Sequence, residues 1–295
     1  MSTPAARAYG PSAFGGSLRR FVELTLTLAH TDFKLRYFGS ALGYFWSLAR
    51  PLLFFGVIYV FFTQILHVGQ GIPHYGVYLL TGIVLWTFFG EATGNSVSAL
   101  VAREGLLRKV RFPRIAIPLA VTLTSVFNLA MNFIAVIVFA LINGVDPRWS
   151  WLWMFPIVLG FIMMALGVGL LLSSLYVRFR DVQPIWDVTS QILFYCSPIM
   201  YLASFYKSFE HLVMLNPFAL MLTQMGHAFV HPAAYWTVVA GPKGPIRVLK
   251  APMPSGFAAA GGLKHVLASV AVVPLVLGFG LWFFAHEAPH VAENL

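Results

Sequence analysis

Long apolar stretches separated by short polar ones dominate the pattern of this chain. Six such stretches follow one another, at 44–66, 75–99, 115–142, 151–176, 185–202 and 265–285. Crossing the hydrocarbon core of a bilayer takes about 20 mostly apolar helical residues, because each backbone polar group must be hydrogen-bonded within the segment. The pattern therefore predicts an all-α integral membrane protein with six transmembrane helices.

A seventh apolar stretch, 211–230, is shorter and differs in character. Asn216-Pro217 interrupts it, and it carries Gln224 and His227. It predicts an interfacial or re-entrant helix inside a long external segment, 203–264. The part of that segment from 231 to 262 is rich in proline and glycine.

Residues 18–38 have a mixed pattern. Phe21, Leu24 and Leu28 recur at helical spacing among charged residues, although residues 24–28 also alternate as a strand would. We expect an amphipathic cytoplasmic interface helix at 18–38. It follows a flexible N-terminus at 1–17 and precedes a permease domain at 39–285 and a cytoplasmic tail at 286–295.

Composition supports the membrane assignment. The chain is 59% hydrophobic and 10% charged, whereas soluble domains are about 45–50% apolar and about 25% charged. Lipid can cover such a surface, and no basic face with interleaved aromatics suggests nucleic-acid binding. The single cysteine, Cys196, excludes an intramolecular disulfide and a thiolate cluster. We expect it to be a small buried residue.

The basic residues predict the orientation. Most of the 19 Lys and Arg residues precede the first span or lie between spans two and three and between spans four and five, while the loop at 67–74 has none. Because Lys and Arg are retained on the cytoplasmic side, both termini are expected in the cytoplasm.

Catalytic and metal-binding patterns are weak. No G-x-x-x-x-G-K-[ST] phosphate loop occurs, so ATP-driven work would need a partner. Residues 286–290 match the zinc-protease pattern H-E-x-x-H, but Pro289 falls in the turn that must be helical. We expect a frayed tail and no metal site there.

Charged and aromatic residues inside the spans have both structural and functional interpretations. A proton-coupled transporter would gather several ionisable groups in mid-membrane, but the spans hold only Glu91 and Asp187, which we expect to be paired or to cap helices. The aromatics either pack ordinarily or form a flat, sugar-stacking wall of a conduit. These candidates are Phe55, Tyr59 and Phe62 in the first span, and Phe194, Tyr195 and Tyr201 in or near the end of the fifth.

Five short motifs at helix ends resemble those of a known family. They are Asp32 to Trp46 (DFKLRYFGSALGYFW) with Pro51-Leu52, Arg108 to Arg114 (RKVRFPR), Arg178 to Asp181 (RFRD), Ser197 to Tyr201 (SPIMY), and Leu215-Asn216-Pro217. Their order and positions resemble permeases of the ABC-2 type, above all those that export lipid-linked polysaccharides such as O-antigen, teichoic acid or galactan. The resemblance covers about residues 20–285.

This resemblance implies a permease subunit of an ATP-driven exporter in the bacterial inner membrane. A homodimer would pair with two nucleotide-binding ATPase subunits, which would bind ATP and Mg, and the chain itself would need no cofactor. A coupling loop at 99–114 would contact the ATPase, and short helices in 204–230 would gate the exit. The implied residues are Arg103, Glu104, Arg108, Lys109, Phe112, Pro113 and Arg114 for coupling, Asp32, Lys34, Arg36 and Tyr37 for the interface helix, and Ser197, Pro198, Asn216 and Pro217 for the gate.

Two alternatives remain at this point. An ABC-2 exporter of a small hydrophobic drug or lipid would use the same ATPase, and a proton-coupled secondary transporter would need none. The chain departs from the family at 231–262, which is longer than usual, so we expect an additional element over the exit.

Overall fold

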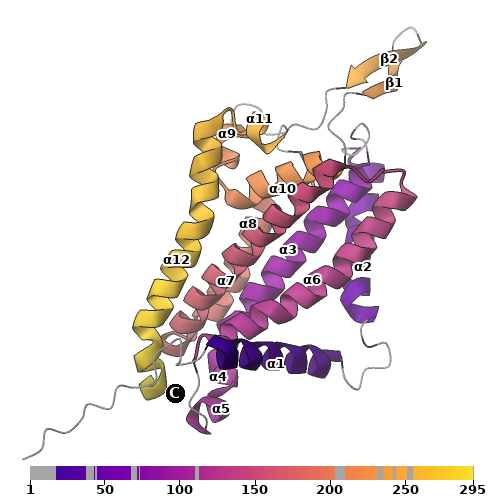
Figure 1. The fold of residues 1–295 in the computed structure, drawn as a ribbon. Helices are drawn as coiled ribbons and strands as arrows, with labels where there is room; N and C mark the ends of the chain where they lie inside the picture. Colours follow the sequence, from indigo (N-terminus) through magenta and orange to yellow (C-terminus); the bar gives the residue numbers. More distant parts are fainter. Residues whose placement is uncertain are drawn as a thin grey trace, which may run out of the picture.

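The computed structural model describes residues 18–37, 43, 45–67, 72, 74–109, 113–202, 210–230, 235–241, 244–250 and 255–294. The described chain is helical apart from one β-hairpin (Figure 1). Its helices are α1 (Leu18–Tyr37), α2 (Phe45–Val60), the π-helical turn η1 (Phe61–Ile65), α3 (Tyr75–Val97), α4 (Ala99–Ala102), α5 (Glu104–Lys109), α6 (Ala116–Ile142), the 3-10 turn η2 (Trp149–Trp153), α7 (Met154–Arg178), α8 (Val182–Cys196), α9 (Glu210–Val213), α10 (Pro217–Phe229), α11 (Gly256–Ala259) and α12 (Leu263–Asn294).

Five helical segments are long and apolar enough to cross a membrane. They match five of the six expected spans within a few residues. Their bounds are Phe45–Ile65, Tyr75–Val97, Ala116–Ile142, Trp149–Arg178 and Leu263–Glu287.

The expected span at 185–202 is instead a 15-residue helix, α8, with an irregular stretch after it. At about 1.5 Å per residue α8 is about 22 Å long, which is shorter than the hydrocarbon core of about 30 Å. Ser197 ends the helix in an extended conformation, because a residue that precedes proline disfavours the helical region. Hydropathy continues past this break, and so the sequence suggested one longer span.

Helix α3 is the centre of the bundle. In its membrane-spanning segment 72% of the residues are buried, against 17% in the segments of α2 and of α12. Leu79, Leu80, Leu85 and Phe89 on α3 are fully buried. The first and last membrane-spanning helices, α2 and α12, therefore lie at the periphery, and the described core is built around α3.

Helix α12 packs closely along α7 through two glycines. A Cβ added to Gly167 would lie 2.8 Å from the backbone of Leu277, and a Cβ on Gly280 would collide with the backbone of Gly167. Helices approach this closely in membranes where small residues leave room for backbone contact. The stripe of α12 that faces inward continues through Ser269, Val273 and Phe284.

The elements outside the spans lie at two opposite ends of the bundle (Figure 1). Helices α1, α4 and α5 and the end of α12 lie together at one end, which we call the α1 end. Helices α9, α10 and α11 and the hairpin lie at the other, the α10 end.

The hairpin was not predicted by the all-α expectation. Strand β1 (Tyr235–Gly241) pairs antiparallel with β2 (Gly244–Lys250), with Gly241 opposite Gly244 and Tyr235 opposite Lys250. Both strands hold β-branched residues, which favour strands, but the surrounding prolines and glycines hid this signal. The hairpin lies within 231–262, the segment that is longer than usual for the family and in which an additional element was expected.

The tail also differs from the expectation. Helix α12 runs as far as Asn294, so residues 286–294 are helical, Pro289 included. A frayed tail was therefore the wrong prediction for these residues.

Replacing Gly280 with valine should separate α12 from α7. Overpacking a close contact costs roughly 1–3 kcal/mol, so we expect Gly280→Val to lower the thermal stability of the purified protein in detergent. Gly278→Val is the matched control, since nothing lies within 4 Å of a Cβ at Gly278. Equal melting temperatures for both variants would contradict this packing.

Candidate transport pathway and coupling surface

Helix α1 lies across the α1 end of the bundle and packs on α6 (Figure 1). Thr25 and Ala29 are buried, and the hydroxyl of Thr124 on α6 donates to the Ala29 carbonyl at 3.2 Å. The Phe33 ring meets the Phe127 ring edge-on at 5.7 Å between centroids. The expected apolar stripe at Phe21, Leu24 and Leu28 is half-buried beside these contacts.

The expected coupling loop forms two short helices, α4 and α5, and Arg103 lies between them. The Arg103 guanidinium pairs with the Asp32 carboxylate of α1, and both side chains are mostly shielded, at 20% and 28% exposure. This ion pair thus joins the expected interface helix to the expected coupling loop.

The other expected coupling residues are only partly described. Arg108 and Lys109 belong to α5, but their side chains lie outside the described residues, as does Phe112 altogether. Pro113 and Arg114 lie three and two residues before the start of α6, and partial burial lowers the pKa of the Arg114 guanidinium by desolvation. Glu104 opens α5.

The last turn of α1 contacts the membrane domain through Arg36. Its Nη1 lies 3.4 Å from Glu91 Oε2 on α3, and the same oxygen accepts a hydrogen bond from the side-chain amide of Asn128 on α6 at 3.0 Å. The expected pairing of Glu91 is thereby confirmed. Lys34 is exposed, and the side chain of Tyr37 lies outside the described residues.

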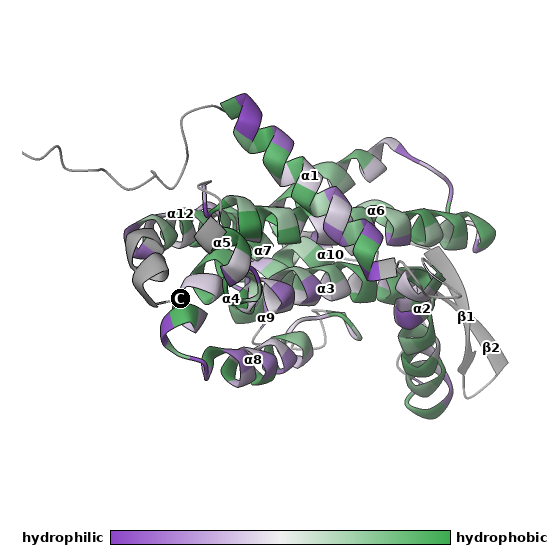
Figure 2. Ribbon diagram, turned by 90° about the horizontal axis from the view of Figure 1, so that it is seen from below, coloured by the Kyte–Doolittle hydropathy of each residue, from purple (hydrophilic) through white to green (hydrophobic). Residues whose placement is uncertain are grey.

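Helix α8 combines one anchored face with an exposed surface on which polar residues lie beside Ile185, Val188 and Ile192. Trp186 donates its indole N–H to the Thr93 hydroxyl of α3 at 3.2 Å and is buried. Asp187, Gln191 and Tyr195, spaced four residues apart, are exposed on another face, which we call the α8 polar stripe. Hydrophilic positions on α8 are visible from the α1 end in Figure 2.

Helices α2 and α8 flank α3 on the side opposite α1 (Figure 2). The rings of Phe54 on α2 and Phe194 on α8 lie 6.0 Å apart. Cys196, which was expected to be buried, is exposed at the end of α8, although Phe194 in the same turn is buried.

The aromatic candidates separate by burial. Phe55 and Phe194 are 8% exposed and belong to the core, whereas Tyr59 and Tyr195 are 38% and 59% exposed. Phe62 and Tyr201 are half-buried against the core. Of these six candidates, the two exposed ones are therefore the tyrosines.

The expected gate residues gather at the α10 end. Asn216 caps α10 by accepting the Phe218 N–H at 3.0 Å, and Pro217 occupies the first turn, as is favourable at a helix start. The Asn216 amide also lies 3.5 Å from the buried Ser197 hydroxyl. Residues that end α8 and begin α10 are thus in contact.

Two tyrosines of α3 that the sequence did not single out hold the irregular stretch after α8. Tyr75 donates to the carbonyl of Met200 at 2.6 Å, and Tyr78 donates to the carbonyl of Pro198. Both rings are buried. Their position at the start of a hydrophobic run gave no signal that their hydroxyls were needed.

Comparison with known proteins agrees with this arrangement. The family model for ABC-2 type transporters matches residues 23–229. The chain belongs to the ABC-2 type transporter family. It is 31% identical to an O-antigen export system permease protein RfbA of Klebsiella pneumoniae over 211 residues, which is 71% of this chain and 81% of the relative. An RfbA of Myxococcus xanthus is 30% identical over 210 residues (70% and 80%), and the polysialic acid transport protein KpsM of Escherichia coli is 23% identical over 195 residues (63% and 73%).

An ABC-2 permease is a multi-pass membrane subunit of a transporter and not an enzyme, and it works with an ATPase partner. This removes the zinc-protease and proton-coupled alternatives. Glu287, the glutamate of the H-E-x-x-H pattern, pairs instead with Arg178 at 3.2 Å.

The Asp32–Arg103 pair should couple α1 to the loop of α4 and α5. In a double-mutant cycle of Asp32→Ala and Arg103→Ala, we expect a coupling energy of about 1 kcal/mol, because the pair is shielded but not fully buried. Reversible unfolding in mixed micelles would measure it. Strictly additive losses would show that the pair contributes nothing.

Proposed function

We propose that this chain is the membrane subunit of an ATP-driven exporter that moves a lipid-linked polysaccharide, of the O-antigen, teichoic acid or galactan type, across the bacterial inner membrane. The named activities of its relatives support this class of cargo. The observation that carries the proposal is the α8 polar stripe, because a helix inside a membrane domain exposes Asp187 and Gln191 only where it faces water or a partner.

The conduit would run along α8 and be completed by a second copy of the chain. Among the described residues, α2 exposes large apolar side chains such as Leu53 and Val57 and packs little against the rest. Such a surface suits contact with another protomer as well as with lipid. Because the spans contain no internal repeat, two copies would provide the two halves of the pathway.

The polar stripe favours a glycan over a small hydrophobic cargo. Sugar hydroxyls exchange hydrogen bonds with Asp187 and Gln191, and the exposed ring of Tyr195 offers a flat face for pyranose stacking, whereas the ring of Tyr59 stacks on Tyr75. A hydrophobic drug or lipid would gain nothing from passing charged and amide side chains.

Helix α8 would be the sixth crossing despite its length. Irregular backbone is tolerated at membrane depth where it is buried in protein or lines a water-filled cavity. The stretch from Ser197 to Met200 is buried and is held by Tyr75 and Tyr78, so it meets the first condition. The contact between Ser197 and Asn216 would let α9 and α10 act as the gate of the conduit.

Coupling to the ATPase would pass through the α1 end. Two ATPase subunits would contact α4 and α5, and the Asp32–Arg103 pair would carry their movement to α1. From α1 the Arg36–Glu91 contact leads to α3, the central helix. The α1 end would therefore be cytoplasmic, with both termini on that side, in agreement with its basic loops.

Reversing the charge at Arg108 and Lys109 should stop export without preventing membrane insertion. In cells that carry only Arg108→Glu, Lys109→Glu, we expect long lipid-linked glycan to accumulate on the cytoplasmic side, as in cells depleted of the protein. Extraction of polyprenyl-linked glycans and sugar analysis would measure this accumulation and identify the cargo.

The control variant is Lys264→Glu, which reverses a charge at the start of α12, at the α10 end. It should leave surface glycan unchanged. Depleted cells that still display every surface polymer and accumulate no lipid-linked glycan would contradict polysaccharide export and favour a small hydrophobic cargo.

A further inference from the structure

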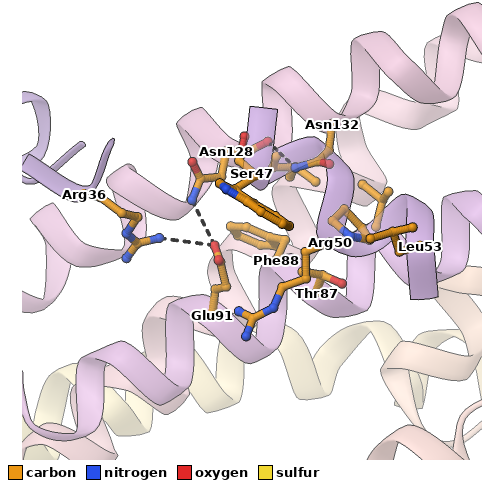
Figure 3. A pocket seen from close by; sticks show the side chains of 13 residues that line it. Arg36, Ser47, Arg50, Leu53, Thr87, Phe88, Glu91, Asn128 and Asn132 are labelled. Carbon is orange, nitrogen blue, oxygen red and sulfur yellow. Dashed lines mark hydrogen bonds and ion pairs between the residues drawn. The ribbon is translucent and has the colours of Figure 1, made fainter. Parts of the chain in front are cut away.

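A cavity of about 530 Å³ opens between the end of α1 and helices α2, α3 and α6. Its volume is in the range of about 300–1,000 Å³ that is usual for small-ligand sites. Arg36, Arg50, Glu91, Asn128 and Asn132 contribute its polar groups (Figure 3). The cavity is distinct from the α8 polar stripe, which none of its lining residues belongs to.

Arg50 is the unusual member of this group. It is the sixth residue of α2, about 7.5 Å into that helix at 1.5 Å per residue. Arg50 is exposed and has no hydrogen-bond or ion-pair partner among the described residues, whereas Arg36 is paired with Glu91. An arginine inside a spanning segment is costly unless it is paired or reaches water.

The charges of the cavity favour an anion. Glu91 offsets Arg36, and its Oε2 is already bonded by Arg36 and by the amide of Asn128. The charge of Arg50 is left over. In Figure 3 a dashed line joins Arg36 to the carboxylate of Glu91 and none reaches Arg50, so that an anion in the cavity would meet the unpaired guanidinium of Arg50.

The walls of the cavity favour an amphiphile. Leu53, Val84, Phe88 and Leu129 line it together with the polar groups. Guanidinium groups match the geometry of phosphate oxygens bidentately. In a bilayer, phosphate attached to an apolar chain is the head group of a lipid.

We infer that this cavity binds the phosphate head group of a lipid, with Arg50 and Arg36 as its anion-binding groups and the apolar walls in contact with the start of the chain. The lipid is either the polyprenyl diphosphate that carries the cargo or an anionic phospholipid of the bilayer. The first source rests on the proposed function. The second does not.

Lipid binding to the purified full-length chain tests this inference without an ATPase or export. The probes are a polyprenyl diphosphate, phosphatidylglycerol and an uncharged polyprenol, each titrated in uncharged detergent and followed by native mass spectrometry. Losing a hydrogen-bonded ionic contact with phosphate weakens binding by about ten- to hundredfold. We expect that loss in Arg50→Gln for the phosphate lipids, with partial retention in Arg50→Lys.

Two further variants separate the site from general effects. Arg20→Gln removes the same charge from an exposed position of α1 outside the cavity and should bind as the native chain does. Thr87→Phe keeps both arginines but narrows the cavity, of which Thr87 is a lining residue, and should weaken binding. This variant also tests the inference if Arg50→Gln proves unstable.

Tighter binding of polyprenyl diphosphate would identify the cargo lipid as the ligand, and equal binding of phosphatidylglycerol would identify a bilayer lipid. Both results support the site. Polyprenol binding as tight as that of the diphosphate, or native affinity in Arg50→Gln or in Thr87→Phe, would overturn it. Because export plays no part in this measurement, failure here leaves the proposed function intact.

Discussion

The need to satisfy polar groups away from water governs this structure. On the central helix α3 the hydroxyl groups of Thr81, Thr93 and Ser96 donate to carbonyls one turn earlier, whereas the buried hydroxyl of Ser269 on α12 has no partner among the described residues. Backbone that leaves the helix after α8 is held by tyrosine hydroxyls. Gln191 on the exposed stripe of α8 and Arg50 on α2 have no such partner among the described residues, and the constraint indicates that water, a ligand or another protomer must supply one. The two proposed sites follow from these exceptions.

The same constraint accounts for the connection between the α1 end and the bundle. Two ion pairs join separate elements there, Asp32 with Arg103 and Arg36 with Glu91. Both start from α1, four residues apart on one face of the helix. A displacement of α4 and α5 by a bound ATPase would therefore act on α1 and, through it, on the core helix α3. Helix α12, fixed to α7 by glycine contacts, also meets this end, because Phe284 packs in one buried cluster with Ala99 and Leu100 of α4.

Hydropathy predicted five spans to within a few residues, because their length and apolar content depend on the lipid and not on tertiary contacts. The stripe of α1 was also predictable from its period. The length of α8 was not, since the break at Ser197-Pro198 depends on local backbone preferences inside an apolar run. The hairpin depends on the pairing of two strands, which the composition of the segment does not indicate. The helical tail depends on the continuation of α12 through a proline, which the composition does not indicate either. The Asp32–Arg103 pair joins residues 71 positions apart, and no pattern in one sequence indicates such a contact.

The central claim is that α8 faces water, and the accessibility of engineered thiols tests it most directly. Cys196 is the only cysteine, so Cys196→Ser provides a thiol-free background for single cysteines at Gln191, on the polar stripe, and at Leu275, which is 67% exposed on α12. A small water-soluble thiol reagent is added to open membrane fragments, so that both faces are reached. The account predicts fast modification at position 191 and protection at position 275. Equal protection at both positions would mean that α8 faces lipid, and would contradict a conduit along it.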